Sequence, residues 1–341
     1  MKAIVINKTL IITGILLLPL TSCRKDHQPC ESFTETKVFN TAGTSDMSFA
    51  NKYVGFISGG IEFDMGIAVI AKTIDGGVSW VKIPVYIESS PSALIRNIFA
   101  KGVDSVYATY TSRDSRFGVC FSKDGGLTWN NLGNFTVDVG YSGLYFKNSK
   151  LGFVCRAGDI LQTKDGGSTW DTVFDYDGFG GIGKLFFTSD KIGYAYGGFV
   201  DDYGSFGTLV KTTDGGDTWT ELTSMQKFVT CFSFVDDNTG YAFTFDNDIY
   251  KTTDGGDSWV LLNNITGQGC SYYSAIVTGK TKYFGTGWSI FKTTDDFKTI
   301  KRVYESPVYN AELSVRAVQT SENTLFFLSS QQSIIKIELN N

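Results

Sequence analysis

Few side chains in this sequence could carry out catalysis. His27 is the only histidine and lies near the N-terminus, which excludes Ser-His-Asp and Cys-His nucleophile systems and histidine-ligated zinc from the rest of the chain. No glycine-rich phosphate-binding motif occurs in a strand-to-helix setting, so we expect no cofactor. The cysteines lack C-x-x-C spacing, so we expect no metal site. Glycoside hydrolysis stays open, because it requires only two carboxylates or a tyrosine with a glutamate.

Aspartate recurs in one fixed setting. Five segments read Ser/Thr-x-Asp-Gly-Gly-x-Ser/Thr-Trp, and a sixth keeps its aspartate but lacks the glycines and the tryptophan. Such an aspartate can accept backbone N–H groups of its own turn, and the glycine supplies a positive φ. The tryptophan can pack between neighbouring sheets. We therefore assign a structural role to Asp75, Trp80, Asp124, Trp129, Asp165, Trp170, Asp214, Trp219, Asp254, Trp259 and Asp295.

The spacing of these aspartates predicts a repeat architecture. Successive aspartates are 49, 41, 49, 40 and 41 residues apart, which is the period of propeller blades. Each unit also contains a short apolar strand, a polar turn and a segment such as Gly240-Tyr241-Ala242. We expect an all-β chain, with six four-stranded blades over about residues 46–308. Strands near 313–318, 324–328, 333–339 and 35–40 would form a seventh blade that closes one domain, residues 35–341.

Composition agrees with many short strands. Aromatic residues make up 15% of the chain, glycine occurs 38 times and proline only five times. No long stretch places apolar residues at helical spacing. The net charge of −5 and the absence of a basic cluster argue against nucleic acid as a partner.

The N-terminus has the features of a targeting segment. Lys2 and Lys8 form a positively charged region before an apolar run, residues 9–20, that is too short to span a bilayer comfortably. The run ends in Leu-Thr-Ser-Cys23, which resembles a bacterial lipobox. The resemblance implies a signal peptide (1–22), a lipidated Cys23 followed by a tether (23–34), and a membrane-anchored protein of the bacterial cell envelope, on the periplasmic or outer-membrane face. The alternative is an ordinary signal peptide that ends near a cysteine.

Five further cysteines follow Cys23, an odd number with irregular spacing. Four of them lie in apolar strand-like runs, where a free cysteine packs as a small hydrophobic residue. One disulfide stays open as an alternative.

The repeated segment resembles the Asp box, or BNR repeat. Residues 240–242 and the segment 251–259 (KTTDGGDSW) are similar to propellers of the photosystem II stability/assembly factor group, and the likeness covers roughly residues 46–305. It implies a scaffold, not an enzyme, that binds protein partners and is expected to be a monomer. Sialidases also carry Asp boxes, but the segment 94–98 (LIRNI) lacks their Arg-Ile-Pro motif. A glycan-binding or glycan-hydrolysing propeller is therefore the alternative.

The repeats differ in length between the second and third strands. The distance from the second-strand aromatic to the aspartate is 19, 17 and 20 residues in blades 1, 2 and 4, but 12, 13 and 11 in blades 3, 5 and 6. In Asp-box propellers these loops lie opposite the boxes, on the ligand-binding face. The candidate binding residues, which could instead be ordinary solvated loop tips, are Glu62, Phe63, Asp64, Arg113, Arg116, Phe117, Asp175, Tyr176, Phe199, Asp201, Asp202, Tyr203 and Phe206.

The predicted anchor can be tested by removing its sulfur. We expect Cys23→Ser to release the protein from the membrane into the soluble periplasmic fraction, because no acyl chain could then be attached. Fractionation followed by mass spectrometry of the mature N-terminus measures this. A mutant that stays on the membrane, or a mature chain that does not begin at Cys23, contradicts the prediction.

Overall fold

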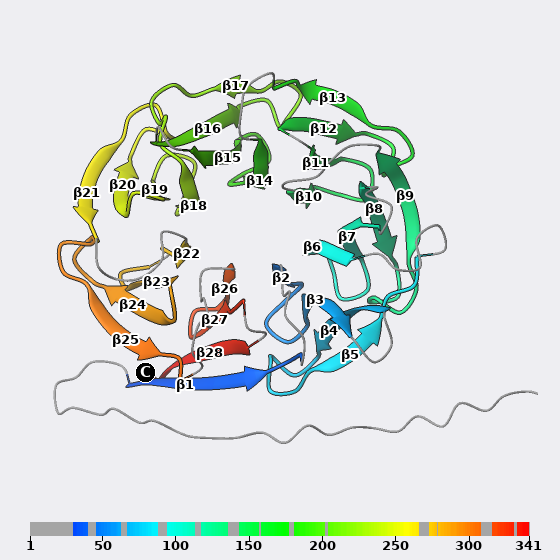
Figure 1. Ribbon diagram of the computed structural model, residues 1–341, viewed down its shortest axis with the longest axis horizontal. Helices are drawn as coiled ribbons and strands as arrows, with labels where there is room; N and C mark the ends of the chain where they lie inside the picture. Colours follow the sequence, from blue (N-terminus) through cyan, green and yellow to red (C-terminus); the bar gives the residue numbers. More distant parts are fainter. Residues whose placement is uncertain are drawn as a thin grey trace, which may run out of the picture.

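The computed structural model describes residues 30–39, 46–62, 67–87, 94–112, 117–135, 143–156, 158–176, 181–201, 204–265, 273–277, 279–307, 316–330 and 333–340. Every regular element in these ranges is a strand, and the strands form seven four-stranded antiparallel sheets arranged in a ring (Figure 1). This confirms the seven-bladed propeller. The signal segment and Cys23 lie outside the described residues.

The first six blades use consecutive strands, which we call A to D from the centre outward. Blade 1 contains β2 (Asp46–Phe49), β3 (Gly55–Glu62), β4 (Ile67–Thr73) and β5 (Val81–Pro84). Blade 2 contains β6 (Leu94–Ala100), β7 (Val106–Thr111), β8 (Phe117–Ser122) and β9 (Asn130–Phe135). Blade 3 contains β10 (Leu144–Phe146), β11 (Gly152–Arg156), β12 (Asp159–Thr163) and β13 (Asp171–Phe174).

The second half of the ring follows the same plan. Blade 4 contains β14 (Ile182–Phe187), β15 (Gly193–Asp201), β16 (Gly204–Thr212) and β17 (Thr220–Glu221). Blade 5 contains β18 (Val229–Phe234), β19 (Gly240–Thr244), β20 (Asp248–Thr252) and β21 (Val260–Asn264). Blade 6 contains β22 (Tyr273–Ile276), β23 (Lys282–Thr286), β24 (Ser289–Thr293) and β25 (Lys301–Glu305).

Blade 7 closes the ring with strands from both ends of the chain. Its order is β26 (Arg316–Ser321), β27 (Thr324–Leu328), β28 (Ser333–Asn340) and, outermost, β1 (Cys30–Lys37). β1 pairs antiparallel with β28 along its whole length. Glu31 of β1 also accepts hydrogen bonds from Lys292 Nζ at 2.6 Å and Tyr283 Oη at 2.7 Å, both in blade 6. The N-terminal strand therefore completes blade 7 and ties it to its neighbour.

The repeated C–D turns are held by their own side chains. In blade 1, Asp75 Oδ1 accepts the Ser79 N–H at 2.9 Å, and Asp75 Oδ2 accepts the Ser79 hydroxyl at 2.5 Å. Gly77 has φ +80°, and a Cβ there would come within 2.7 Å of the Phe326 ring in blade 7. Glycine is therefore required both by the backbone and by the close approach of the neighbouring blade.

The sixth turn shows how the fold tolerates the loss of both glycines. Asp296 and Phe297 adopt positive φ values of 60° and 66°. Phe297 is fully buried in the core between blades 5 and 6. Asp296 accepts hydrogen bonds from Tyr241 Oη at 2.5 Å and Lys251 Nζ at 2.6 Å in blade 5. Burial and two charge-assisted contacts thus offset the backbone strain.

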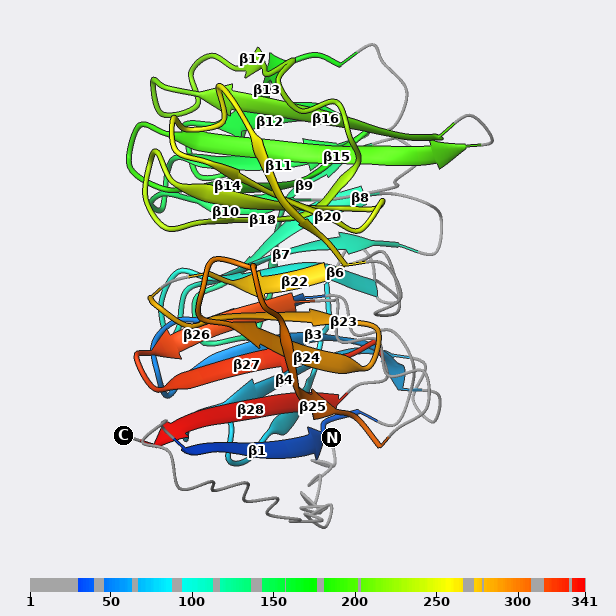
Figure 2. The ribbon, with the colours of Figure 1, turned by 90° about the vertical axis from the view of Figure 1, so that its left-hand side faces the viewer.

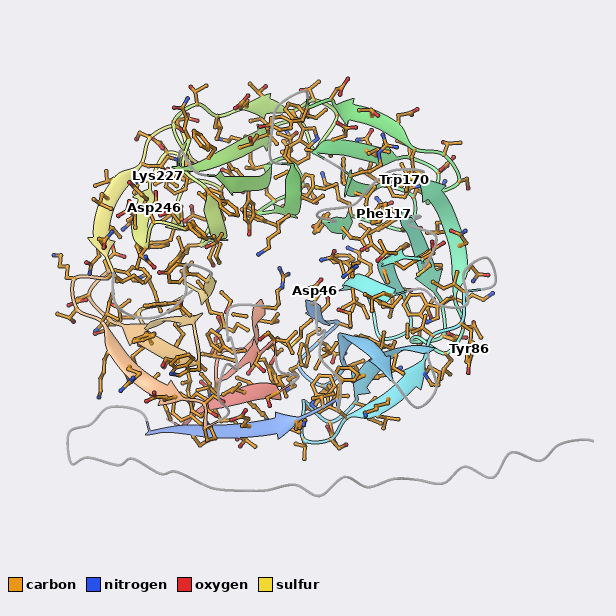
Figure 3. The ribbon with its side chains drawn as sticks, in the orientation of Figure 1. Asp46, Tyr86, Phe117, Trp170, Lys227 and Asp246 are labelled. Atoms are coloured by element: carbon orange, nitrogen blue, oxygen red, sulfur yellow. The ribbon has the colours of Figure 1, made fainter. Side chains whose placement is uncertain are left out.

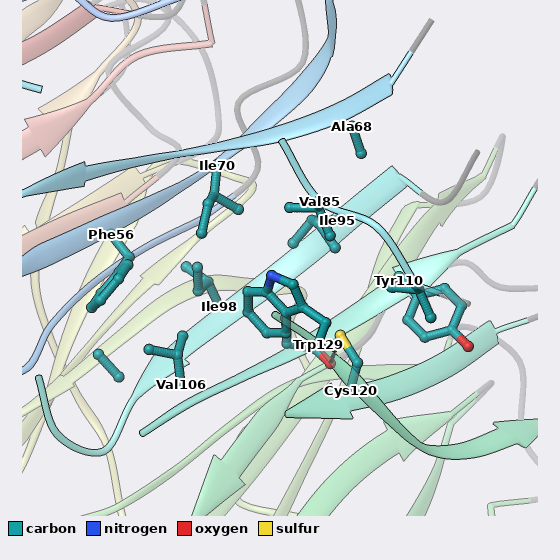
Figure 4. Close-up of a cluster of buried hydrophobic side chains, with 13 residues drawn as sticks. Phe56, Ala68, Ile70, Val85, Ile95, Ile98, Val106, Tyr110, Cys120 and Trp129 are labelled. Carbon is teal, nitrogen blue, oxygen red and sulfur yellow. Dashed lines mark hydrogen bonds between the residues drawn. The ribbon is translucent and has the colours of Figure 1, made fainter. Parts of the chain in front are cut away.

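Side chains from one blade also bind the turn of the next. Lys72 Nζ donates to Gly125 O at 3.2 Å, and Lys211 Nζ donates to Gly255 O at 2.8 Å. The apolar core lies between the blades, and in the cluster between blades 1 and 2 Trp129 packs against residues such as Phe56 and Ile70 (Figure 4). The Trp129 indole N–H donates to Gly126 O at 3.1 Å, so its polar atom is satisfied inside the core.

Three of the cysteines belong to these cores. Cys120, Cys155 and Cys231 are buried and free, and burial raises the pKa of each thiol. They pack as small hydrophobic residues, as their strand positions predicted. Cys30 lies in β1, whereas Cys270 lies outside the described residues.

The tryptophan of an intact turn should dominate local stability. Trp129 is 7% exposed, so we expect Trp129→Ala to reduce the free energy of unfolding by about 3–5 kcal/mol. Ile300, the residue at the equivalent position of the sixth turn, is partly exposed and smaller, so Ile300→Ala should cost less. Denaturant titrations of both variants measure this. A neutral Trp129→Ala would contradict a structural role for the repeated turn.

The turn aspartates also predict a pH dependence. Hydrogen bonds from the hydroxyl and backbone N–H of Thr128 lower the pKa of Asp124 to about 2, below the value of about 4 in an unfolded chain. Their stabilisation is therefore present above about pH 4 and lost as the pH falls through about 2. We expect the urea midpoint to fall from about pH 5 to about pH 2, with a smaller fall for Asp124→Asn. Asp104→Asn, an exposed A–B turn position, is the control and should behave as the native chain does.

Candidate functional site

The ring has two faces of different construction. The A–B and C–D turns share one face: in blade 1 the Gly76 N–H of the C–D turn donates to Tyr53 O of the A–B turn at 2.9 Å. We call this the turn face, and the opposite one, reached by the B–C and D–A connections, the loop face. Figure 2 shows the turn face on the left and the tip of the β15–β16 hairpin on the loop face at the right.

The B–C insertion of blade 4 forms a hairpin, where the sequence predicted a loop. β15 and β16 are nine residues each, and their pairing continues through Phe199↔Phe206 to Asp201↔Gly204. The inserted residues include aromatic and β-branched types such as Phe199, Val200 and Phe206, which favour strands, so they extend the pairing instead of interrupting it. Phe206 is 42% exposed on this hairpin. The hairpin projects farther from the ring than the neighbouring strands (Figure 2).

Contacts at the hairpin base hold it to the ring. The Gly207 N–H donates to Gln226 O at 3.0 Å, and Tyr176 Oη lies 2.6 Å from Thr208 Oγ1. Beside this base, Lys227 bridges Asp246 and Asp248 of blade 5 at 3.1 and 2.9 Å (Figure 3). Tyr176 was a predicted binding residue, and the structure places it at the base of the hairpin, partly buried.

One predicted binding residue is wrong. Phe117 is fully buried, and its ring packs 5.8 Å from that of Phe135 in the core between blades 2 and 3 (Figure 3). The reason is that β8 begins at Phe117 and pairs it with Thr111, so its side chain enters the core. Of the other candidates, Asp175 is exposed, Glu62 ends β3, and Phe199 and Asp201 lie in β15. Phe63, Asp64, Arg113, Arg116, Asp202 and Tyr203 lie outside the described residues.

The centre of the ring contains a hollow of about 380 Å³. Its wall is formed mainly by the A strands and A–B turns of blades 4 and 5, with residues of blades 6 and 7. It includes Tyr273 and Arg316, the first residues of β22 and β26, and Thr188 and Asp236 in A–B turns. The hollow therefore extends along the inner strands from the loop-face end to the turn-face end.

Two cations face this hollow. Lys184 of β14 is exposed to it, donates to Thr230 O at 3.2 Å and lies 6.0 Å from the centroid of the Tyr196 ring. Desolvation by the surrounding protein lowers the pKa of Lys184. Arg316 Nε lies 3.5 Å from Asp46 Oδ1, and Figure 3 shows Asp46 at the inner edge of the ring. Among the described residues at the loop-face end of the hollow, one carboxylate thus faces two cations, so their summed charge is positive.

Neither Lys184 nor Arg316 is among the candidate site residues that the sequence predicted. The one available signal was a lysine within the apolar run of β14 (IGKLFF). No sequence pattern indicated that β14 and β26 would line the same hollow.

The carboxylates near the hollow are already engaged. Asp236 is the only acidic residue among the described residues of its wall, and it accepts the N–H groups of Asn238 and Thr239, which lower its pKa. Asp46 Oδ2 accepts the Ile98 N–H at 3.1 Å. Glycoside hydrolysis requires two carboxyl groups that face the same bond, and the described wall does not provide that pair.

Among the described residues, no three His, Cys, Asp or Glu side chains are placed to share a metal ion. No helix of that part of the chain is long and apolar enough to cross a membrane.

Comparison with known proteins supports the fold. No family model and no curated protein sequence matches this chain. A solved structure of YCF48 bound to a D1 peptide is similar, with a TM-score of 0.69, 15% identity, and coverage of 93% of this chain and 98% of that one. YCF48 from Cyanidioschyzon merolae has a TM-score of 0.67 at 15% identity, covering 90% and 98%. A GH74 xyloglucanase from Xanthomonas campestris has a TM-score of 0.63 at 11% identity, covering 88% of this chain and 52% of the enzyme. These similarities establish the β-propeller fold.

Proposed function

We propose that this chain is a lipid-anchored scaffold of the bacterial cell envelope that binds protein partners on its loop face. The observation that carries the proposal is the β15–β16 hairpin, which projects from that face with Phe206 exposed. Exposed aromatic side chains on a rigid support are typical of protein interfaces. The ring supplies the rigid support, since the base of the hairpin is hydrogen-bonded to its neighbours.

The different structural constraints on the turn face and the loop face support this proposal. The turn aspartates and glycines are committed to turn geometry and blade packing, so they have little freedom to change. The B–C connection differs in length between blades, and its extension beyond Gly198 and Gly207 in blade 4 does not alter the ring. Binding residues concentrate on such variable segments. The positive loop-face end of the hollow, with Lys184 and Arg316, would favour partners that carry carboxylates.

Solved structures with a similar fold also support protein binding by this chain. One YCF48 structure is bound to a D1 peptide, so a ring of this shape can present a peptide-binding surface. The repeated turn resembles the Asp box, and this resemblance supports the proposal that the chain acts as an assembly scaffold. The anchor is proposed from the lipobox ending in Cys23, which would hold the scaffold on a membrane through its N-terminal lipid.

A glycan-binding or glycan-hydrolysing propeller is the second candidate. Its support is the similarity to a GH74 xyloglucanase, at 11% identity and over 52% of the enzyme. The engaged state of Asp46 and Asp236 favours the scaffold over the hydrolase. A glycan array probed with the purified protein distinguishes the two functions, since only the second predicts saturable glycan binding.

Trimming the hairpin tests the proposed binding face. Replacing residues 199–206 with Asn-Gly would connect Gly198 to Gly207 through a two-residue turn and keep the contacts at the base. We expect the melting temperature to change little, because loop-closure entropy depends weakly on length. Recovery of partners in a pull-down from the native envelope should fall at least about fivefold, since an aromatic hot-spot residue contributes about 1 kcal/mol or more.

The matched control is Ser168→Ala on the turn face, which should change neither quantity. A collapse of the melting temperature in the trimmed chain would show that the hairpin belongs to the core. An unchanged pull-down with a normal melt would exclude the hairpin as the binding element.

A further inference from the structure

Apolar side chains are concentrated on one part of the turn face. The A–B and C–D turns of blades 1 and 2 carry five exposed ones, which we call the apolar turn patch: Tyr53 (54% exposed), Ile74 (70%), Val78 (59%), Val103 (42%) and Leu127 (65%). The turns are linked within each blade, where the Gly76 N–H donates to Tyr53 O and the Gly125 N–H to Asp104 O. Lys72 joins the two blades through Gly125 O. The patch therefore has a fixed shape.

The fold does not require apolar residues at these positions. The residue after the second glycine is Val78 and Leu127 in blades 1 and 2, whereas the same turn position holds Ser168, Asp217, Asp257 and Lys298 in blades 3 to 6. All of these side chains point to solvent from the same turn, so the turn accepts any of them. One other large apolar side chain of the described A–B and C–D turns is exposed, Val235 in blade 5 at 46%. Five of these six side chains lie on two adjacent blades, which indicates contact with another surface.

The charges around the turn face are unevenly distributed. Exposed lysines flank the patch at Lys52, Lys101 and Lys123, and one exposed aspartate outside the repeated C–D turn motif, Asp104, lies among them. The turn face of blades 4 and 5, across the ring, carries four further exposed aspartates, Asp190, Asp217, Asp236 and Asp257, and one exposed lysine in its A–B turns, Lys191. Asp217 and Asp257 pair with Lys164 and Lys211, so the acidic excess is carried mainly by Asp190 and Asp236. A surface rich in anionic headgroups would attract the first region and repel the second.

The chain enters the ring on this same face. Each D strand starts at its C–D turn, and β1 is the D strand of blade 7, pairing Cys30 with Asn340. β1 therefore starts at the turn face, as Figure 2 shows. Blade 7 adjoins blade 1, because the neighbouring A strands β2 and β26 are in contact. Cys30 is seven positions after Cys23, which gives a covalent reach of at most about 25 Å.

We infer that the apolar turn patch docks into the interface of the lipid bilayer, so that the propeller stands on the membrane with blades 1 and 2 lowest and its loop face pointing away. This inference rests on the lipid anchor proposed above. A lipid on Cys23 holds the turn face within a short distance of the bilayer. Apolar tips ringed by lysines are the composition that inserts at the headgroup boundary. The acidic turns of blades 4 and 5 then tilt away from the membrane, and the β15–β16 hairpin is free to meet partners.

The orientation can be measured on the lipidated chain in vesicles of phosphatidylethanolamine and phosphatidylglycerol. A nitrobenzoxadiazole fluorophore is attached to L127C on the patch or, as the matched control, to F206C on the loop face. Cys30 and Cys270 are replaced by serine, and the three buried cysteines stay unlabelled because of their burial. We expect doxyl-labelled lipids to quench the fluorophore at 127 at least about threefold more than at 206.

A second pair of variants tests the patch itself. Val78→Asp should reduce the quenching at 127, because it places a charge in the apolar surface, whereas Ser168→Asp at the same turn position of blade 3 should leave it unchanged. Equal quenching at 127 and 206, or a blue shift at 127 without lipid quenching, would overturn the inference and assign the patch to a protein contact. A chain that fails to float with the vesicles would contradict the proposed anchor and this inference together. A chain that floats but shows equal quenching would contradict this inference alone, so the two failures are distinguishable.

Discussion

A closed ring requires that its last sheet be completed by a strand from the other end of the chain. Blade 7 has only three C-terminal strands, and without β1 its outer edge would expose unpaired backbone groups. The eight paired residues of β1 satisfy that edge, and the Glu31–Lys292 ion pair, whose side chains are 10% and 14% exposed, fixes β1 against blade 6. A well-shielded pair of this kind is costly to break, because either charge alone would be left desolvated.

Closure also determines how the two faces are used. Because β1 takes the place of a D strand, the chain enters at the turn face, where every other blade has a C–D turn. Those turns are occupied by their own hydrogen bonds and by glycines pressed against the preceding blade. The sixth turn departs from the pattern and recovers its contacts through Phe297 and Asp296. Differences in residue type and length between blades are therefore concentrated in the tips of the turns and in the loop-face hairpins, where they leave the ring intact.

Charged side chains of three blades meet at the hollow in the centre of the ring. Lys184 and Arg316 come from blades 4 and 7, and Asp46 comes from blade 1. Lys184 donates to Thr230 O at 3.2 Å and Arg316 Nε lies 3.5 Å from Asp46 Oδ1, whereas Asp46 also accepts the N–H groups of Met47 at 2.9 Å and Ile98 at 3.1 Å. The two cations are thus less fully paired than the carboxylate, and they give this end of the hollow an electrostatic character that the aromatic hairpin lacks.

The sequence by itself determined the repeat, the number of blades and the role of the turn aspartates, because these depend on local spacing and on hydrogen bonds within eight residues. It also predicted a closing N-terminal strand, since three leftover C-terminal strands needed a fourth, but near residues 35–40, whereas β1 is Cys30–Lys37 and includes residues expected in the tether. Only the tertiary structure decided that Phe117 is core and that the blade 4 insertion continues as paired strands, because burial and pairing depend on neighbouring strands. It alone brought Lys184, Arg316 and Asp46 together, and gathered Tyr53, Val78 and Leu127 on the face where β1 begins. These residues are tens to hundreds of positions apart, and only closure of the ring makes them neighbours.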